Sequence, residues 1–197
     1  MKRSAGDTKC GILEAAYELF YREGFARVSV DAIAEAAGVT KRTVYYHFDS
    51  KDALVGAVLE HQHDYALGRI QSWAETPSDD PWIMIDEIFG RLERWASEPK
   101  WLGSGFTRIT MELADLPGHP ARAAARRHKA AVEHWLAVRL ADMDVDAPGE
   151  TARQIKLLLE GCLSLILIHG DTSYARSAAA AAKAIVTRNR AEKRRSA

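Results

Sequence analysis

The segment GVTKRTVYYHF, residues 38–48, holds a glycine, two threonines, two cations, two tyrosines and a histidine within eleven residues. Lys41 and Arg42 can neutralise phosphates or donate hydrogen bonds to the acceptor atoms of guanine. Thr43 can hydrogen-bond to a phosphate, and an exposed tyrosine ring can pack on a sugar or on a thymine methyl group. This combination predicts contact with double-stranded DNA.

The two tyrosines differ as contact candidates. Tyr45 lies two residues before His47 and three before Phe48, and an aromatic side chain at that spacing can either pack in the core or expose its polar tip. Both interpretations stay open for Tyr45. Tyr46 is the better candidate for a DNA contact.

Two short helices must position these side chains. Ser29 is placed to cap a helix over residues 30–37, and Gly38 can end that helix in a left-handed conformation that glycine adopts without a Cβ clash. Thr40 can then cap a second helix over residues 41–48. Two helices joined in this way predict a helix-turn-helix unit, whose second helix enters the major groove. The N-terminal residues of that helix, nearest the bases, are Thr40, Lys41, Arg42 and Thr43.

The flanking sequence supplies support for these short helices. Residues 8–23 form an amphipathic pattern, and Ser50 is placed to cap a long helix from Lys51 toward Trp73. Apolar residues recur with helical spacing through most of the remaining chain, and glycine and proline breaks divide it into about nine helices. The predicted fold is all-α. It has a DNA-binding domain at residues 1–52, a C-terminal ligand-binding and dimerisation domain at 53–190, and a basic tail at 191–197.

The segment SVDAIAEAAGVTKRTVYYHFDSKDAL is similar to the N-terminal DNA-binding segment of the tetracycline-repressor (TetR) family. The shared pattern is a hydroxyl cap, an Ile-Ala pair, Ala-Gly-Val, then Thr-hydrophobic-Tyr, and Phe followed by Ser-Lys. The resemblance implies DNA-backbone contacts by Ser29, Thr43, Tyr45 or Tyr46, His47 and Lys51. It implies base contacts by Thr40, Lys41, Arg42 and Tyr46. Arg42 stands where the family often has glycine or another small residue.

Large aromatic side chains are concentrated in the C-terminal part of the chain. A helix bundle built with so many rings can leave an apolar cavity between its helices, or it can be filled. The resemblance favours the cavity, because members of the family bind a small molecule in this region. The residues expected to line it are Trp82, Phe89, Trp95, Phe106, Met111, His128 and Trp135.

The segment 151–169 is apolar on nearly all sides. One face can pack in its own domain, which leaves a second face for a partner. Together with the alanine-rich helix that follows, it predicts a four-helix homodimer interface about a two-fold axis. The residues assigned to this interface are Leu157, Leu165, Ile168 and Ile185.

Composition and the absence of other motifs argue against metal-dependent, catalytic and membrane functions. The 27 Lys+Arg balance 27 Asp+Glu, so local rather than global charge must attract DNA. His61 and His63 are two apart on a predicted helix and point away from each other, and Cys-x-x-Cys and His-Glu-x-x-His motifs are absent. We therefore expect no metal, no cofactor and no catalytic site. The lack of a signal pattern and of a membrane-length apolar run predicts a cytoplasmic protein without membrane contact.

These features predict a ligand-responsive transcriptional regulator that binds a pseudo-palindromic operator as a homodimer. The expected action is repression, relieved by a small apolar effector. The alternative is a DNA-binding protein without a small-molecule ligand, acting through a protein partner or as an architectural factor. An apolar cavity in the C-terminal bundle would favour the first, and a solid core with a large exposed apolar patch the second.

Overall fold

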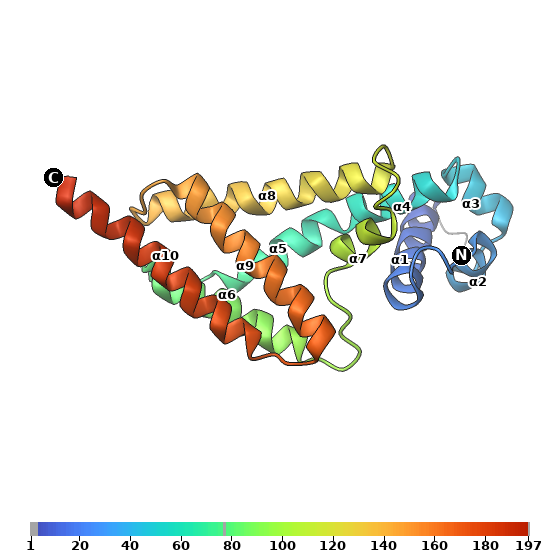
Figure 1. Ribbon diagram of the computed structural model, residues 1–197. Helices are drawn as coiled ribbons and strands as arrows, with labels where there is room; N and C mark the ends of the chain where they lie inside the picture. Colours follow the sequence, from blue (N-terminus) through green and yellow to red (C-terminus); the bar gives the residue numbers. More distant parts are fainter. Residues whose placement is uncertain (1–3, 77, 197) are drawn as a thin grey trace. The chain divides into compact units, whose positions relative to one another are not determined.

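The computed structural model describes residues 4–76 and 78–196, with side chains described as far as residue 190. These residues form ten helices and no strands (Figure 1). The helices are α1 (Ala5–Glu23), α2 (Val30–Ala37), α3 (Lys41–His47), α4 (Lys51–His61), α5 (His63–Trp73), α6 (Pro81–Ala96), α7 (Gly105–Glu112), α8 (Pro120–Asp142), α9 (Pro148–His169) and α10 (Tyr174–Ser196).

The predicted all-α class is confirmed. The long helix expected from Lys51 to Trp73 is divided at Gln62 into α4 and α5. The Gln62 N–H still donates to the Val58 carbonyl at 3.1 Å, so the interruption is a local one. The side chains of the predicted basic tail, 191–197, lie outside the described residues, although the α10 backbone continues to Ser196. In the described part of the chain, every helix is too short or too polar to cross a membrane.

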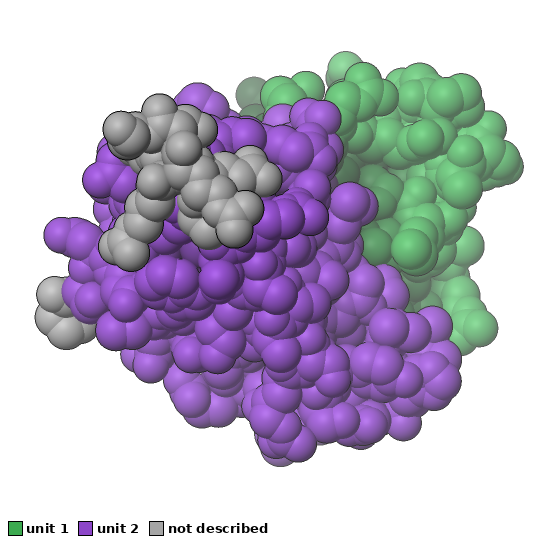
Figure 2. Space-filling view, turned by 60° about the vertical axis from the view of Figure 1, so that its left-hand side comes forward, with its two compact units in different colours: residues 1–64, 104–128 green, residues 65–103, 129–197 purple. Residues whose placement is uncertain are grey.

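The chain divides into two compact units (Figure 2). Unit 1 contains residues 1–64 and 104–128, and unit 2 contains residues 65–103 and 129–197. The first unit therefore holds more of the chain than the predicted DNA-binding domain, 1–52. The physical reason is that α7 packs against α1, and the beginning of α8 contacts α4.

Unit 1 is a small helical bundle around a shared apolar core. Its helices α1, α2, α3 and α4 pack against one another, with α1 contacting both α2 and α4. The most deeply buried side chains of these helices are Ile12, Ala16, Phe20, Ile33, Val44, Leu54, Val55, Val58 and Leu59. The bundle thus supplies the support that the short helices α2 and α3 need.

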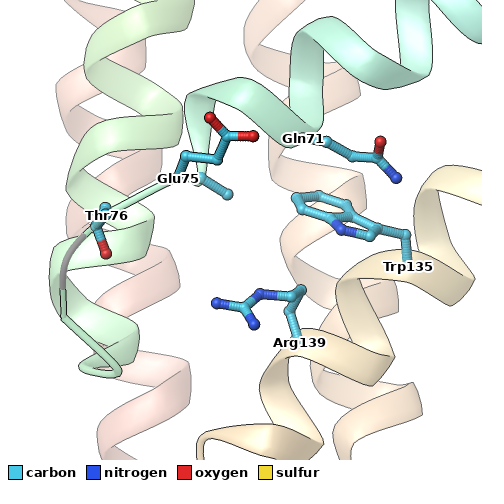
Figure 3. A pocket seen from close by; sticks show the side chains of 6 residues that line it. Gln71, Glu75, Thr76, Trp135 and Arg139 are labelled. Atoms are coloured by element: carbon cyan, nitrogen blue, oxygen red, sulfur yellow. The ribbon is translucent and has the colours of Figure 1, made fainter.

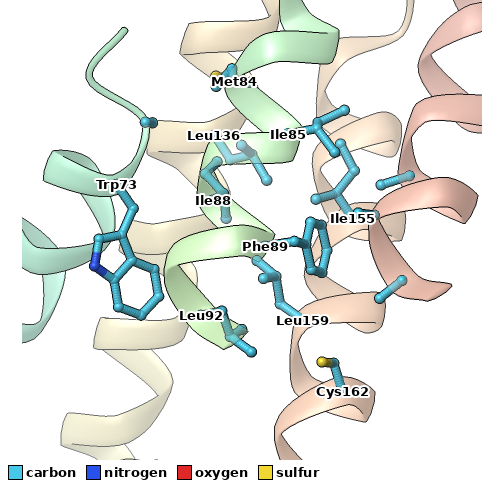
Figure 4. Packing of buried hydrophobic residues seen from close by; sticks show 14 of the residues in the cluster. Trp73, Met84, Ile85, Ile88, Phe89, Leu92, Leu136, Ile155, Leu159 and Cys162 are labelled. Atoms are coloured by element: carbon cyan, nitrogen blue, oxygen red, sulfur yellow. The ribbon is translucent and has the colours of Figure 1, made fainter. Parts of the chain in front are cut away.

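Unit 2 is built mainly from α6, α9 and α10, which pack against one another. Figure 4 shows apolar side chains of α6 meeting those of α9, with Phe89 close to Ile155 and Leu159. Cys162 also belongs to this core, and burial raises the pKa of its thiol to about 11. Cys162 is therefore a buried apolar residue rather than a reactive thiolate.

Within unit 1, α4 and the start of α8 approach closely at Gly56. A Cβ built on Gly56 would lie 2.7 Å from the Pro120 Cβ and 3.4 Å from the Pro120 carbonyl carbon. Neither of these atoms belongs to a flexible side-chain end that can move aside. Only glycine fits at this position without displacing one helix.

We predict that Gly56→Ala destabilises the protein. Overpacking costs about 1–3 kcal/mol, which exceeds the gain of up to about 1 kcal/mol that alanine brings to a helix interior. Urea unfolding provides the measurement. Gly11→Ala is the matched control, because α1 leaves open space around Gly11 and the same substitution there should stabilise. Equal effects of the two substitutions would contradict the close approach.

Candidate nucleic-acid interface

The turn between α2 and α3 is set by hydrogen bonds around Gly38. Gly38 is left-handed, with φ 65° and ψ 37°. Its N–H donates to the Glu35 carbonyl at 3.0 Å, and the Val39 N–H donates to the Ala34 carbonyl at 2.9 Å. This pair of bonds is a Schellman motif, which confirms the predicted glycine turn.

Hydroxyl side chains cap both helices of the motif, as the sequence predicts. Ser29 Oγ accepts from the Ala32 N–H at 3.1 Å, and Thr40 Oγ1 accepts from the Thr43 N–H at 3.1 Å. The hydroxyls of Thr40 and Thr43 are also 2.8 Å apart. These caps satisfy backbone donors that short helices leave unpaired.

Helix α3 buries one face and exposes the other. Val44 is 1% exposed and Phe48, directly after the helix, is 5% exposed. Tyr45 is 45% exposed and Tyr46 is 82% exposed, so burial of Tyr45 in the core is ruled out. The side chains that α3 offers to a partner, here called the recognition surface, are Lys41, Arg42, Tyr45 and Tyr46.

Lys41 forms an ion pair within the helix-turn-helix motif. Its Nζ lies 2.8 Å from Asp31 Oδ2 of α2, and both side chains are exposed. The hydrogen bond to Asp31 raises the pKa of Lys41, so the ammonium stays charged at neutral pH. A phosphate that binds Lys41 must compete with Asp31.

Lys51 and His47 are less accessible than the recognition surface. Lys51 Nζ donates to the Phe25 carbonyl at 2.6 Å and lies 4.2 Å from the centre of the Phe25 ring. Burial lowers the pKa of Lys51. His47 is half-buried, with the rings of Tyr46 and Phe48 beside it. The DNA contacts implied for these two residues stay predictions.

Several residues that position the motif lie far along the chain. His119 is buried, accepts the Ala121 N–H through Nδ1 at 3.1 Å, and places Nε2 3.4 Å from Asp52 near the start of α4. The Glu112 carboxylate accepts the Ala26 N–H at 3.1 Å. A local sequence pattern does not signal these contacts, because the partners are brought together only by folding.

The seven residues expected to line one apolar cavity are divided between the units. Phe106, Met111 and His128 belong to unit 1, and the others to unit 2. Phe106 stacks on His128 with ring centres 3.8 Å apart, whereas Met111 is 65% exposed. Phe89 is 1% exposed within the core of unit 2. A shared apolar cavity for these seven residues stays a prediction.

A cavity of about 500 Å³ lies in unit 2 between α5 and α8 (Figure 3). One ring, that of Trp135, borders it. The other lining residues are mainly polar: Gln71, Ala74, Glu75, Thr76 and Arg139. This composition suits a ligand with a ring and polar substituents better than a wholly apolar one.

Helix α9 exposes the apolar stripe that the sequence assigns to a partner. Leu157 is 67% exposed, Leu165 38% and Ile168 72%. Ile185 on α10 is half-buried. Large apolar side chains gathered on one helix face are typical of a protein–protein contact.

The motif matches a known family model. Residues 12–58 match the model described as "Bacterial regulatory proteins, tetR family". The HTH-type transcriptional regulator TtgR of Pseudomonas putida is 44% identical over 63 residues, which are 32% of this chain and 30% of TtgR. UidR of Escherichia coli is 37% identical over 71 residues, or 36% of each chain. The matched part thus spans about a third of the length of these curated relatives.

Solved structures extend the similarity to most of the chain. A Streptomyces avermitilis protein assigned to the TetR regulators is 30% identical in sequence to this chain, and its crystal structure matches with a TM-score of 0.74. The match covers 89% of this chain and 98% of that one. Reduced NemR of Escherichia coli has a TM-score of 0.81 at 20% identity, covering 91% and 97% of the two chains. The second similarity concerns the fold alone.

Proposed function

The chain belongs to the TetR family of bacterial transcriptional regulators, and on that premise we propose that it represses genes by binding a pseudo-palindromic operator as a homodimer. Regulators of this family bind operator DNA and act as dimers, and the family is one of transcription regulators rather than enzymes. The observation that carries the proposal is the helix-turn-helix of unit 1. The function requires access to chromosomal DNA, so we propose a cytoplasmic location.

The geometry of the motif supports this function through the recognition surface. The first residues of α3 are nearest the base edges when such a helix enters the major groove. Lys41 and Arg42 are exposed there, followed by the exposed rings of Tyr45 and Tyr46. Cations at these positions bind phosphates or guanine, and the rings pack on sugar or thymine methyl groups.

We predict that Lys41→Ala and Tyr46→Ala each weaken operator binding by about tenfold to a hundredfold, as expected for loss of one base or phosphate contact. Asp31→Asn is expected to strengthen binding, because it releases Lys41 and removes a negative charge beside the phosphates. Affinities are measured at fixed salt on a duplex selected from random sequences.

The controls for this experiment are an exposed tyrosine and an exposed cation of unit 2. Tyr65 is 68% exposed, and Arg91 pairs with Glu87 on α6 much as Lys41 pairs with Asp31. Tyr65→Ala and Arg91→Ala should leave operator affinity unchanged. Unchanged affinity in both Lys41→Ala and Tyr46→Ala, with folding intact, would show that α3 is not the recognition helix.

The exposed stripe on α9 supports the proposed dimer. Its residues repeat at helical spacing along one face, and the neighbouring α10 packs against α9 in the same unit. Two copies related by a two-fold axis would cover each other's stripes and form a four-helix interface. Such a dimer also places two recognition helices in successive major grooves.

We predict that Leu157→Asp combined with Ile168→Asp converts the dimer to a monomer in sedimentation velocity, because each carboxylate would be buried without a partner. Met111→Asp is the control. Met111 is comparably exposed, at 65%, but lies on α7 in unit 1. A wild-type protein that is monomeric at micromolar concentration would contradict the dimer, as would a double variant that stays dimeric.

We propose that the effector binds the cavity beside Trp135 and lowers operator affinity. The volume of about 500 Å³ lies in the range of small-molecule sites. A ring can stack on the Trp135 indole while Gln71 and Arg139 bind polar substituents. This effector carries more polar groups than the largely apolar, ring-containing molecule predicted from the tryptophan and phenylalanine content.

We predict reciprocal coupling between effector and operator. A ring-containing compound found by thermal-shift screening should bind about 5–150-fold more weakly when operator DNA is saturating, since linkage makes the coupling equal in both directions. Trp135→Ala should abolish the thermal shift, and Tyr65→Ala should preserve it. Equal affinity with and without operator DNA would reject switching by that compound.

The second candidate is a DNA-binding protein that acts through a protein partner without an effector. Two observations favour it: the packed core around Phe89 and the exposed apolar stripe of α9. The dimer experiment separates the two candidates. If the stripe serves a different protein, the wild type is monomeric and the double variant changes nothing in its sedimentation.

A further inference from the structure

We propose that Cys10, Glu14 and His61 form a zinc-binding site on unit 1, which joins α1 to the C-terminal end of α4. Cys10 and Glu14 are four residues apart on α1 and therefore share one face of that helix. His61 is the last residue of α4. The proposal is independent of the proposed function.

The three donor atoms already converge. Cys10 Sγ lies 3.5 Å from Glu14 Oε1 and 3.9 Å from His61 Nε2. One ligand atom from each residue lies within 4.8 Å of the other two. Zinc binds sulfur at about 2.3 Å and nitrogen or oxygen at about 2.0–2.2 Å, so a tetrahedral ion holds its ligands about 3.3–3.6 Å apart. The two contacts of Cys10 need adjustments of only a few tenths of an ångström, whereas Glu14 and His61, whose ligand atoms lie within 4.8 Å of each other, must approach further to complete the site.

The donor set selects the metal. Thiolate and imidazole are zinc ligands, and a carboxylate is a common third partner. Calcium and magnesium do not suit this site, because both prefer oxygen ligands and two of the three donors here are sulfur and nitrogen. Three protein ligands leave one coordination position for water. Glu14 and His61 are exposed and Cys10 is half-buried, so the ion can reach the site from solvent.

The packing of unit 1 holds these ligands in place. Helices α1 and α4 pack against each other, and ligands carried on packed helices are positioned more accurately than ligands on loops. Without metal, the Cys10 thiol donates a hydrogen bond to Glu14, which raises the pKa of that thiol. A bound zinc ion would replace this proton.

The expectation of no metal site came from neighbouring histidines and short motifs. His61 and His63 do not pair with each other, because the His63 ring contacts His128. Folding instead brings His61 to Cys10, 51 residues earlier in the chain. Zinc at this position would link two helices of unit 1. Because the ligand set is assembled only in the folded unit, binding would stabilise that unit.

The test uses the full chain, expressed without a histidine tag, reduced and stripped of metal by a chelator. Zinc is titrated against a chromophoric competitor, and we expect one ion per chain and a higher thermal unfolding midpoint. Cys10→Ser and His61→Ala should each weaken zinc binding by at least about tenfold. The matched controls are Cys162→Ala, which removes the buried cysteine of unit 2, and His134→Ala, which removes an exposed histidine of α8.

Cobalt provides a direct readout of the thiolate. Bound Co²⁺ should show a thiolate-to-metal charge-transfer band that is lost in Cys10→Ser and kept in Cys162→Ala. Absence of this band in the wild type would overturn the proposal even if a variant failed to fold. Equal zinc affinity of Cys10→Ser, His61→Ala and His134→Ala would also overturn it. Operator binding measured with chelator present tests the proposed function separately.

Discussion

The left-handed turn at Gly38 is the constraint on which the recognition surface depends, because it sets the angle between α2 and α3. These helices have eight and seven residues, too few to persist alone in water. The Schellman bonds of Gly38 and Val39 and the two hydroxyl caps satisfy their backbone groups. Val44 anchors α3 beneath the turn. Exposure of Arg42 and Tyr46 on one surface follows from this local geometry.

Helix α4 transmits the position of α3 to the rest of unit 1. It begins at Lys51, soon after α3 ends at His47, so the two helices cannot move independently by much. Contacts hold α4 along its length. At its start, Lys51 contacts Phe25 and Asp52 contacts His119. Further along, Gly56 lies against Pro120, and Glu60 near the end of the helix pairs with Arg127. Phe25 precedes α2, whereas the other three partners, His119, Pro120 and Arg127, come from the α7–α8 segment of unit 1. An effector that displaces α4 must therefore disturb this segment as well.

The sequence predicted the features that depend on nearby residues. Caps at Ser29 and Thr40, the turn at Gly38 and the exposure of Tyr46 all follow from side-chain type and helical spacing. Contacts that need the folded chain were missed, because their partners are far apart in sequence. His119 with Asp52 and Cys10 with His61 are of this kind. The aromatic content of the C-terminal part did not indicate which rings border the cavity beside Trp135, since that depends on how helices pack.

Under the proposed function, the ion pair of Lys41 with Asp31 would affect how the motif discriminates between DNA sequences. Non-specific affinity comes mainly from cations that neutralise phosphates, and this chain has no excess of them. Pairing Lys41 with Asp31 on the recognition side lowers that contribution further. The base contacts proposed for Arg42 and Tyr46 would then supply a larger share of the binding free energy. A motif with little general attraction for DNA spends less time on the many non-specific sites of a genome, so weak local charge favours selectivity over occupancy.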